Sequence, residues 1–191
     1  MLTMEMKRLV IGITGASGVI YGIRLLQAMH GIAETHLVIS ERAKDILSLE
    51  TDLALGEVEA LASFVHSDSD LSSPLASGSF ISHGMIIAPC SIKTLSAIAN
   101  SYCQTLIARA ADVNLKERRR VVLVVRETPL HLGHLRLMTQ VTEIGGVILP
   151  PVPAFYQEPK TVMDIVDQTV GKVLDLFEIP HKLFRRWREE G

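Results

Sequence analysis

The sequence has few cysteines, no long apolar run and no surplus of basic residues, and each absence excludes a class of protein. Its 191 residues include two cysteines, Cys90 and Cys103, which cannot form a disulfide framework and favour a reducing, cytoplasmic setting. No stretch of about 18 unbroken apolar residues, the length of a membrane span, is present. The opening MLTMEMKRLV lacks a signal-peptide core. A formal net charge of −2 gives no reason to expect nucleic acid as a partner.

The composition is that of a chain with a large core. Hydrophobic residues make up 48% of the sequence and the mean hydropathy is +0.29, which favours one domain over residues 1–191. The aliphatic surplus is expected in a sheet covered on both faces or in an oligomer interface. The only dense basic run, KERRR at 116–120, is typical of a solvated helix end.

Apolar, β-branched runs alternate with helical patterns along the chain. The runs predict strands at 9–14, 35–40, 84–90, 121–127 and 146–151. The helical patterns cover 19–31, 41–50, 92–100, 105–119, 132–146 and 161–177. This alternation predicts an open parallel α/β sheet with helices on both faces.

Three segments fit this alternation less well. EVEALASF (57–64) is predicted to be a helix, and the polar stretch 66–79 a loop. The proline-rich segment 150–160 is predicted to be an ordered loop. The amphipathic tail 178–191, which holds the only tryptophan, Trp187, is expected to dock on a neighbouring subunit rather than to anchor the chain in a membrane.

Small and hydroxyl-bearing residues follow three of the predicted strands, at the edge where parallel sheets bind ligands. The glycines of GITGASG (12–18) are spaced by three, unlike those of the dinucleotide fingerprint, and the motif lacks the P-loop lysine. It is either a ligand-binding turn or simply a tight strand-to-helix connection. Ser40 and Ser91 are natural helix N-caps, and together with the glycine turn they suit a phosphate or a flavin side chain.

Charged residues within apolar segments are further candidates. Arg109 lies on a strongly apolar predicted helix, where it either pairs with Asp112 or holds a ligand. Arg126 and Glu127 end a strand of valines and leucines, and Glu50 ends a helix, so both carboxylates are candidate proton carriers.

Two other motifs favour a structural role. The histidines of HLGH (131–134) have no acidic or thiolate partner at a matching spacing, so metal binding is not favoured. Cys90 has no neighbouring histidine in the sequence, which favours an inert buried thiol over a nucleophile.

Several long blocks in the same order resemble one known family. The blocks ITGASGVIYG, APCSIKTLSAIA, RAADVNLKERR, VRETPLHLGHLRLM and PPVPAFY are similar to those of the UbiX-type flavin prenyltransferases, once described as aromatic-acid carboxy-lyases. The resemblance runs from about Lys7 to about Trp187. It implies a flavodoxin-like Rossmann fold and an enzyme that transfers a dimethylallyl group from dimethylallyl phosphate to N5 and C6 of reduced FMN. It also implies a homododecamer and a UbiD-type decarboxylase that receives the prenylated FMN.

The resemblance assigns site residues by position. For FMN it implies Gly15, Ala16, Ser17, Ser40, Ser91, Ile92, Lys93, Thr94 and Arg126. For dimethylallyl phosphate it implies Arg109, Lys116, Arg126, Tyr156, Lys172 and Trp187. Many relatives have arginine at the position of Lys172. Lysine keeps the positive charge but cannot make the paired hydrogen bonds of a guanidinium.

The implied mechanism needs no metal ion. The chain has no D-D-x-x-D motif to hold magnesium, so fixed cations, with Arg109 and Lys116 among them, must stabilise the leaving phosphate. Glu127 and the released phosphate are the candidate proton carriers, Ser17 is expected to orient the flavin and a transferring proton, and Glu50 is expected to help shape the pocket. Tyr156 and Trp187 are expected to shield the allylic cation.

Two alternative functions remain open from the sequence. An FMN-dependent aromatic-acid decarboxylase could share the fold, but the P-x-M-N-x-x-M-W motif of decarboxylases that act on cysteinyl substrates is missing, and PPVPAFY stands in that region. A non-catalytic FMN carrier would need the glycine and serine turns but no second cluster of cations.

Overall fold

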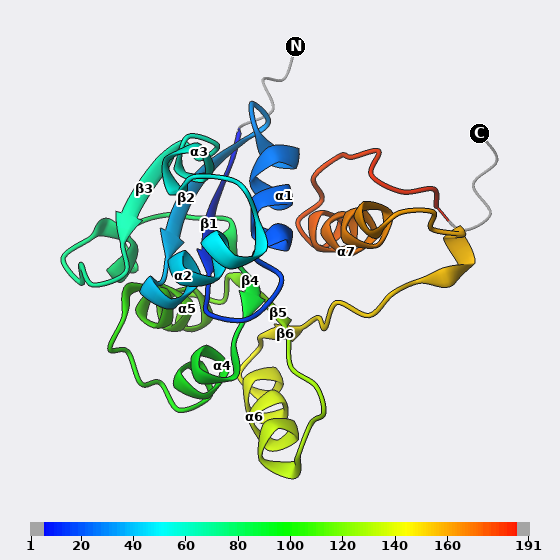
Figure 1. Ribbon diagram of the computed structural model, residues 1–191. Coiled ribbons are helices and arrows are strands. Elements are labelled where there is room, and N and C mark those ends of the chain that lie inside the picture. The colour runs from blue at the N-terminus through cyan, green and yellow to red at the C-terminus, as the bar shows by residue number, and fades with distance from the viewer. Residues whose placement is uncertain (1–5, 187–191) are drawn as a thin grey trace.

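The computed structural model describes residues 6–186, and its core is a six-stranded parallel sheet (Figure 1). The strands are β1 (Lys7–Ile13), β2 (Ala33–Ile39), β3 (Phe64–Ser67), β4 (Gly84–Cys90), β5 (Arg120–Val125) and β6 (Val147–Ile148). Their order is β3-β2-β1-β4-β5-β6, with every neighbouring pair parallel. Without the edge strand β3, this is the flavodoxin-like order. The expected fold class is confirmed.

Helices cover both faces of the sheet. They are α1 (Val19–Met29), α2 (Glu41–Glu50), α3 (Leu55–Glu59), α4 (Ile92–Ala99), α5 (Leu106–Lys116), α6 (Leu132–Glu143) and α7 (Val162–Leu176). Alternate residues of each strand face opposite layers: Leu9 and Ile11 pack toward α1 and α7, whereas Val10 packs toward α4 and α5. Because helices cover both faces, all seven residues of β4 are buried.

One predicted helix is wrong in part. The segment 57–64 was expected to be helical throughout, but α3 ends at Glu59 and Phe64 begins β3. Phe64 pairs with His36 of β2 in the sheet, and their rings stack with centroids 4.7 Å apart. These long-range contacts override the local helical pattern.

A close approach fixes α1 against the middle of the sheet. A Cβ on Gly22 would lie 2.4 Å from the carbonyl oxygen of Ala88 in β4, so only glycine fits there. This contact brings the N-terminal half of α1 next to the strand end that leads into Ser91.

The described part of the C-terminal tail packs on α7 of its own chain, and docking of the tail on a neighbouring subunit stays a prediction. Gly171 of α7 leaves room for Phe184, since a Cβ there would lie 2.4 Å from the Phe184 ring. His181 bonds Asp175 of α7 at 3.0 Å. Residues 178–186 therefore dock on α7, and Trp187 lies outside the described residues.

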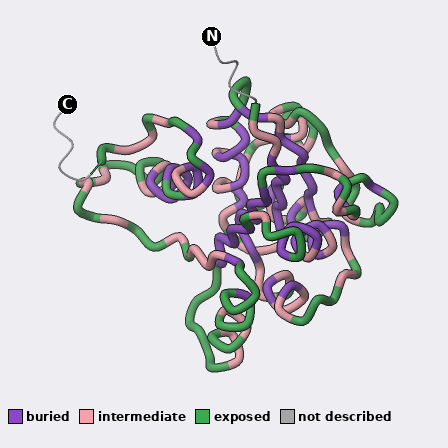
Figure 2. Tube along the Cα trace, turned by 180° about the vertical axis from the view of Figure 1, so that it is seen from behind, coloured by how far each residue is buried: buried purple, intermediate pink, exposed green. Residues whose placement is uncertain are grey.

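The molecule has one extended, exposed part. The linking arm, residues 149–161, leaves the sheet after β6 and runs past a 3₁₀ turn (Phe155–Gln157) to α7 (Figure 1). Figure 2 shows that the arm and α6 are largely exposed. Exposed apolar side chains lie there, among them Leu132, Val152 and Phe155. Within residues 6–186, no helix has the length and apolar character to cross a membrane.

Candidate active site at the carboxyl edge of the sheet

Four loops meet where the parallel strands end. They follow β1, β2, β4 and β5, and hydrogen bonds between strand ends hold them in place. Ser40 N donates to Ile13 O at 3.0 Å, and Arg126 N donates to Cys90 O at 3.1 Å. This edge includes the position where α1 and α4 leave toward opposite faces, which is where open α/β sheets bind ligands.

The glycine turn is held by an acid from another helix. Gly18, with φ 99°, adopts the left-handed conformation that favours glycine and caps α1. Glu50, at the end of α2, accepts hydrogen bonds from Gly18 N at 2.8 Å and Val19 N at 3.2 Å. Its carboxylate thus occupies the positive end of α1, where an anionic ligand would otherwise bind. A pocket role was expected for Glu50, but this bond joins residues far apart in the sequence.

Ser40 and Ser91 are both N-caps, as predicted. Ser40 Oγ accepts from Ala43 N at 3.3 Å, and Ser91 Oγ accepts from Thr94 N at 3.3 Å. The two helix starts differ in charge. Glu41 lies in the first turn of α2, whereas the first turn of α4 has no acid and contains the exposed Lys93. Of these two helices, α4 therefore has the N-terminus better suited to an anion.

Arg126 and Glu127 lie exposed at the end of β5. Within residues 6–186, the Arg126 guanidinium has no hydrogen bond or ion pair and so is available to a ligand. Burial raises the pKa of Tyr21, and the positive charge of Arg126 opposes this rise, so Tyr21 also lies at this edge. Glu127 accepts from Thr128 N at 3.0 Å. Tyr21 was not among the residues predicted for the site.

Arg109 and Lys116 lie at different ends of α5. That helix begins beside β3, where Asp68 accepts a hydrogen bond from Ile107 N at 2.9 Å. Arg109 therefore lies near the carboxyl edge, where it donates to Ala76 O at 3.1 Å and pairs with Asp112 at 3.0 Å. The predicted Arg109–Asp112 pair is confirmed, and a ligand role of Arg109 stays a prediction.

Lys116 is separated from the glycine and serine turns in its own chain. It ends α5 shortly before β5 begins, so it lies at the amino edge of the sheet, where it pairs with Glu117. The assignment of Lys116 to dimethylallyl phosphate stays a prediction, and within one chain Lys116 lies at the opposite edge of the sheet from the flavin loops. The cause is topological, since a helix that precedes a parallel strand ends where that strand starts.

The remaining predicted donor residues lie on the C-terminal elements. Tyr156 is 53% exposed on the linking arm. Lys172, on α7, pairs with Asp175 of the same helix at 4.0 Å. Trp187 lies outside the described residues. Among the predicted donor residues described, only Arg126 directly follows a strand at the carboxyl edge.

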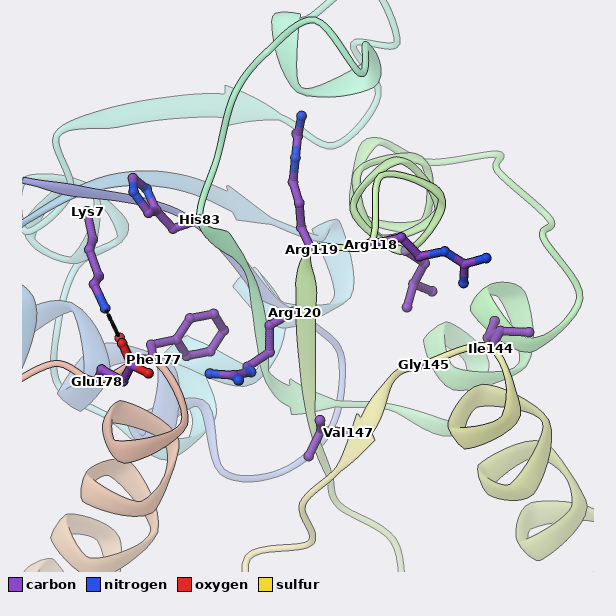
Figure 3. A pocket seen from close by; sticks show the side chains of 11 residues that line it. Lys7, His83, Arg118, Arg119, Arg120, Ile144, Gly145, Val147, Phe177 and Glu178 are labelled. Carbon is purple, nitrogen blue, oxygen red and sulfur yellow. Dashed lines mark hydrogen bonds and ion pairs between the residues drawn. The ribbon is translucent and has the colours of Figure 1, made fainter.

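The amino edge carries a basic hollow of about 490 Å³ (Figure 3). Figure 3 shows Arg118, Arg119 and Arg120 pointing in different directions. Arg119 donates to the carbonyls of Phe80 and Gly78, and Lys7 donates to Phe177 O and pairs with Glu178 at 3.5 Å. Because these cations diverge and two of them are engaged, the hollow is no focused anion site.

The cysteine and histidine motifs have structural roles. Burial raises the pKa of the Cys90 thiol far above its ordinary value, so it is not a nucleophile. His131 caps α6, accepting from Gly133 N at 3.0 Å. Among residues 6–186, no three His, Cys, Asp or Glu side chains are grouped to hold a metal ion.

Comparison with a family model and with solved structures gives the class of protein. The chain matches the family described as Flavoprotein over residues 2–186. A structure described as AnUbiX (PadA1) in complex with FMN and dimethylallyl pyrophosphate superposes with a TM-score of 0.95 and 49% identity, covering 98% of this chain and 100% of that one. A dodecameric FMN-dependent UbiX-like decarboxylase from Escherichia coli O157:H7 gives a TM-score of 0.93 and 47% identity, covering 95% and 99%.

Sequence relatives then give the family. Flavin prenyltransferase UbiX of Escherichia coli K12 is 60% identical over 187 residues, which are 96% of this chain and 99% of that protein. Flavin prenyltransferase UbiX of Thauera aromatica is 59% identical over 181 residues, which are 94% and 93%. The chain belongs to the UbiX flavin prenyltransferase family, as its sequence blocks indicated.

Proposed function

We propose that this chain is a flavin prenyltransferase that transfers a dimethylallyl group from dimethylallyl phosphate to N5 and C6 of reduced FMN. The observation that carries the proposal is the near-full-length identity to UbiX proteins, together with a carboxyl edge that retains the loops such a reaction needs. The product, prenylated FMN, is passed to a UbiD-type decarboxylase.

The chain's own residues favour one orientation of FMN. Glu50 already neutralises the start of α1, so Gly15, Ala16 and Ser17 are left to contact the uncharged part of the flavin. The backbone N–H groups of Ile92 and Lys93 precede the first intrahelical bond of α4, and the Lys93 ammonium adds charge there. The flavin phosphate is assigned to this turn, from Ser91 to Thr94, with Ser40 beside it.

Fixed cations replace a metal ion in the proposed reaction. Departure of the allylic group leaves negative charge on phosphate, and Arg126 stabilises that charge without reorganising. Glu127 holds or moves the proton that prenylation displaces, and Ser17 orients the reacting ring. The reduced flavin, when bound, supplies the nucleophile.

Assembly completes the donor site in this proposal. We assign a dodecamer to this chain, by analogy with the dodecameric relative. The exposed apolar residues of the linking arm and α6 support contacts between subunits. Tyr156, Lys172 and Arg109 then reach dimethylallyl phosphate from neighbouring subunits. A cytoplasmic location belongs to the same proposal and is supported by the unpaired Cys90 and Cys103.

A decarboxylase is the second candidate, because two similar structures are described as decarboxylases. One experiment separates the candidates. Purified protein is incubated anaerobically with reduced FMN and dimethylallyl phosphate, with and without EDTA, and the flavin is analysed by mass spectrometry. A flavin heavier by one isoprene unit in both samples supports prenyl transfer without metal. A parallel sample receives an aromatic acid instead of dimethylallyl phosphate. Carbon dioxide release in that sample, with no new flavin in the others, would favour the decarboxylase over the prenyltransferase.

A further inference from the structure

The hydrogen bonds that join neighbouring strand ends at the carboxyl edge are not all of one kind. Between β1 and β2, and between β4 and β5, a backbone N–H donates to a backbone carbonyl of the neighbouring strand end. Between β1 and β4, the two strands that carry the glycine turn and the Ser91 turn, one such backbone bond, from Thr14 N to Pro89 O at 3.2 Å, is joined by two bonds of a side chain. That side chain belongs to Thr14.

The Thr14 hydroxyl uses both its donor and its acceptor capacity. Its Oγ1 donates to Pro89 O at 2.8 Å and accepts from Ser91 N at 2.8 Å. The backbone N–H of Thr14 donates to the same Pro89 oxygen at 3.2 Å. Thr14 is 1% exposed, so a lost bond there would not be replaced by bulk water.

The topology explains what the side chain adds here. The backbone register of β1 and β4 ends at Gly12 and Ile87. Beyond that point the chain after β1 turns into α1 on one face, and the chain after β4 turns into α4 on the other. The backbone bond from Thr14 N to Pro89 O still joins the two strand ends, and beyond it Thr14 Oγ1 holds Ser91 N, at the start of α4.

We propose that Thr14 is a positioning residue for FMN: it sets the distance between the 15–17 turn and the Ser91–Thr94 turn, so that both contact one flavin. This inference rests on the proposed function, since it takes FMN as the ligand. Thr14 acts through Ser91, whose Oγ caps Thr94 N and donates to Thr94 Oγ1 at 3.1 Å. It touches no reacting atom.

The test uses two substitutions of Thr14 and one matched control. T14V keeps the shape but removes the hydroxyl, and T14S keeps the hydroxyl. The control is T35V, because Thr35 is also buried, at 2% exposure, and its Oγ1 also accepts a backbone N–H, that of Ser63 at 3.1 Å. Thr35 lies on β2 away from the four loops, so T35V measures the structural loss alone.

We expect T14V to raise the Kd for FMN about ten-fold, the usual effect of leaving one buried donor unpaired. T14S and T35V should bind FMN within about two-fold of the wild type, while T35V and T14V lose similar stability in urea. An unchanged Kd in T14V, or an equal rise in T35V, overturns the inference. If T14V does not fold, T14A is measured with the same expectation.

A second readout keeps this inference separate from the proposed function. Hydrogen exchange in the flavin-free protein should quicken at residues 90–95 in T14V but not in T14S or T35V. Unchanged exchange at residues 90–95 in T14V would show that the Thr14 hydroxyl does not hold the Ser91 turn, whatever the protein catalyses. Failure of wild-type protein to make prenylated FMN, with quickened exchange and a ten-fold Kd change still observed in T14V, would overturn the function and leave the positioning role intact.

Discussion

The two edges of the sheet show how differently charge can be arranged on one scaffold. At the amino edge, several cations line a hollow, but they diverge, and Lys7 and Arg119 are bound to protein carbonyls. At the carboxyl edge, small residues and helix starts converge, and the Arg126 side chain is unengaged within residues 6–186. Convergence of preset donors, rather than density of charge, marks the ligand site.

The largest expected effect comes from neutralising one acid at the carboxyl edge, Glu127. We expect E127Q to slow prenyl transfer by about 10²–10⁴-fold, because the amide keeps the shape but cannot carry the proton. Affinity for FMN should stay near that of the wild type. Single-turnover kinetics with mass detection of the product gives the rate. The control is E178Q at the amino edge, which should turn over normally. Full activity in E127Q would remove Glu127 from the mechanism.

A matched pair of arginines tests the contrast between the edges directly. The sequence resemblance assigns Arg126 to FMN as well as to the donor phosphate, so we expect R126A to weaken FMN binding about ten-fold through loss of a charge-assisted hydrogen bond to the flavin. R120A, at the amino edge, should bind FMN as the wild type does, because its guanidinium lies over the Phe177 ring, 6.0 Å from the centroid. Quenching of flavin fluorescence measures both affinities. Equal losses in the two variants would erase the distinction between the edges.

Glu50 gives a smaller effect, on stability. E50A removes the acceptor for Gly18 N and Val19 N, and we expect it to lower the free energy of unfolding by about 1 kcal/mol, as loss of a helix cap does. E50Q retains an acceptor without the charge and should lose less. Urea denaturation measures both. An E50A protein as stable as the wild type would show that this carboxylate does not hold the turn.

The smallest expected effect is a pH dependence from a histidine of the edge strand β3. His66 hydrogen-bonds His36 at 3.0 Å and Ser73 at 3.0 Å. Burial lowers the pKa of His66, and the charge of His36 lowers it further, whereas the charge of Asp70 opposes the shift. A lowered pKa in the folded state means that the unfolded chain binds the proton more readily. The associated stability is present above about pH 6.5 and declines as the pH falls below it.

Thermal unfolding between pH 7.5 and pH 5.5 measures this pH dependence of stability. The midpoint should fall with pH in the wild type and in H30Q, which alters an exposed histidine, and should fall less in H66Q. The carboxyl groups with lowered pKa values, such as Glu34 and Asp175, titrate below this window and do not contribute to it. Identical slopes in all three proteins would exclude His66 as the cause.

The sequence contains most of the fold, because buried strands and amphipathic helices leave local patterns. The N-caps at Ser40 and Ser91 and the Arg109–Asp112 pair were also readable, since their partners lie three residues away. The bond from Glu50 to Gly18 was not, because its partners are distant in sequence and meet only through packing. The edge at which Lys116 lies could have been predicted from the order of α5 and β5 alone.

The most direct measurement of the central claim is a crystal structure of this protein grown with FMN and dimethylallyl phosphate. The account predicts the flavin at the carboxyl edge, between residues 15–17 and Ser91–Thr94, with its phosphate at the start of α4 and Arg126 facing the donor phosphate. A flavin bound in the basic hollow at the amino edge, or a phosphate seated on α1 in place of Glu50, would contradict it.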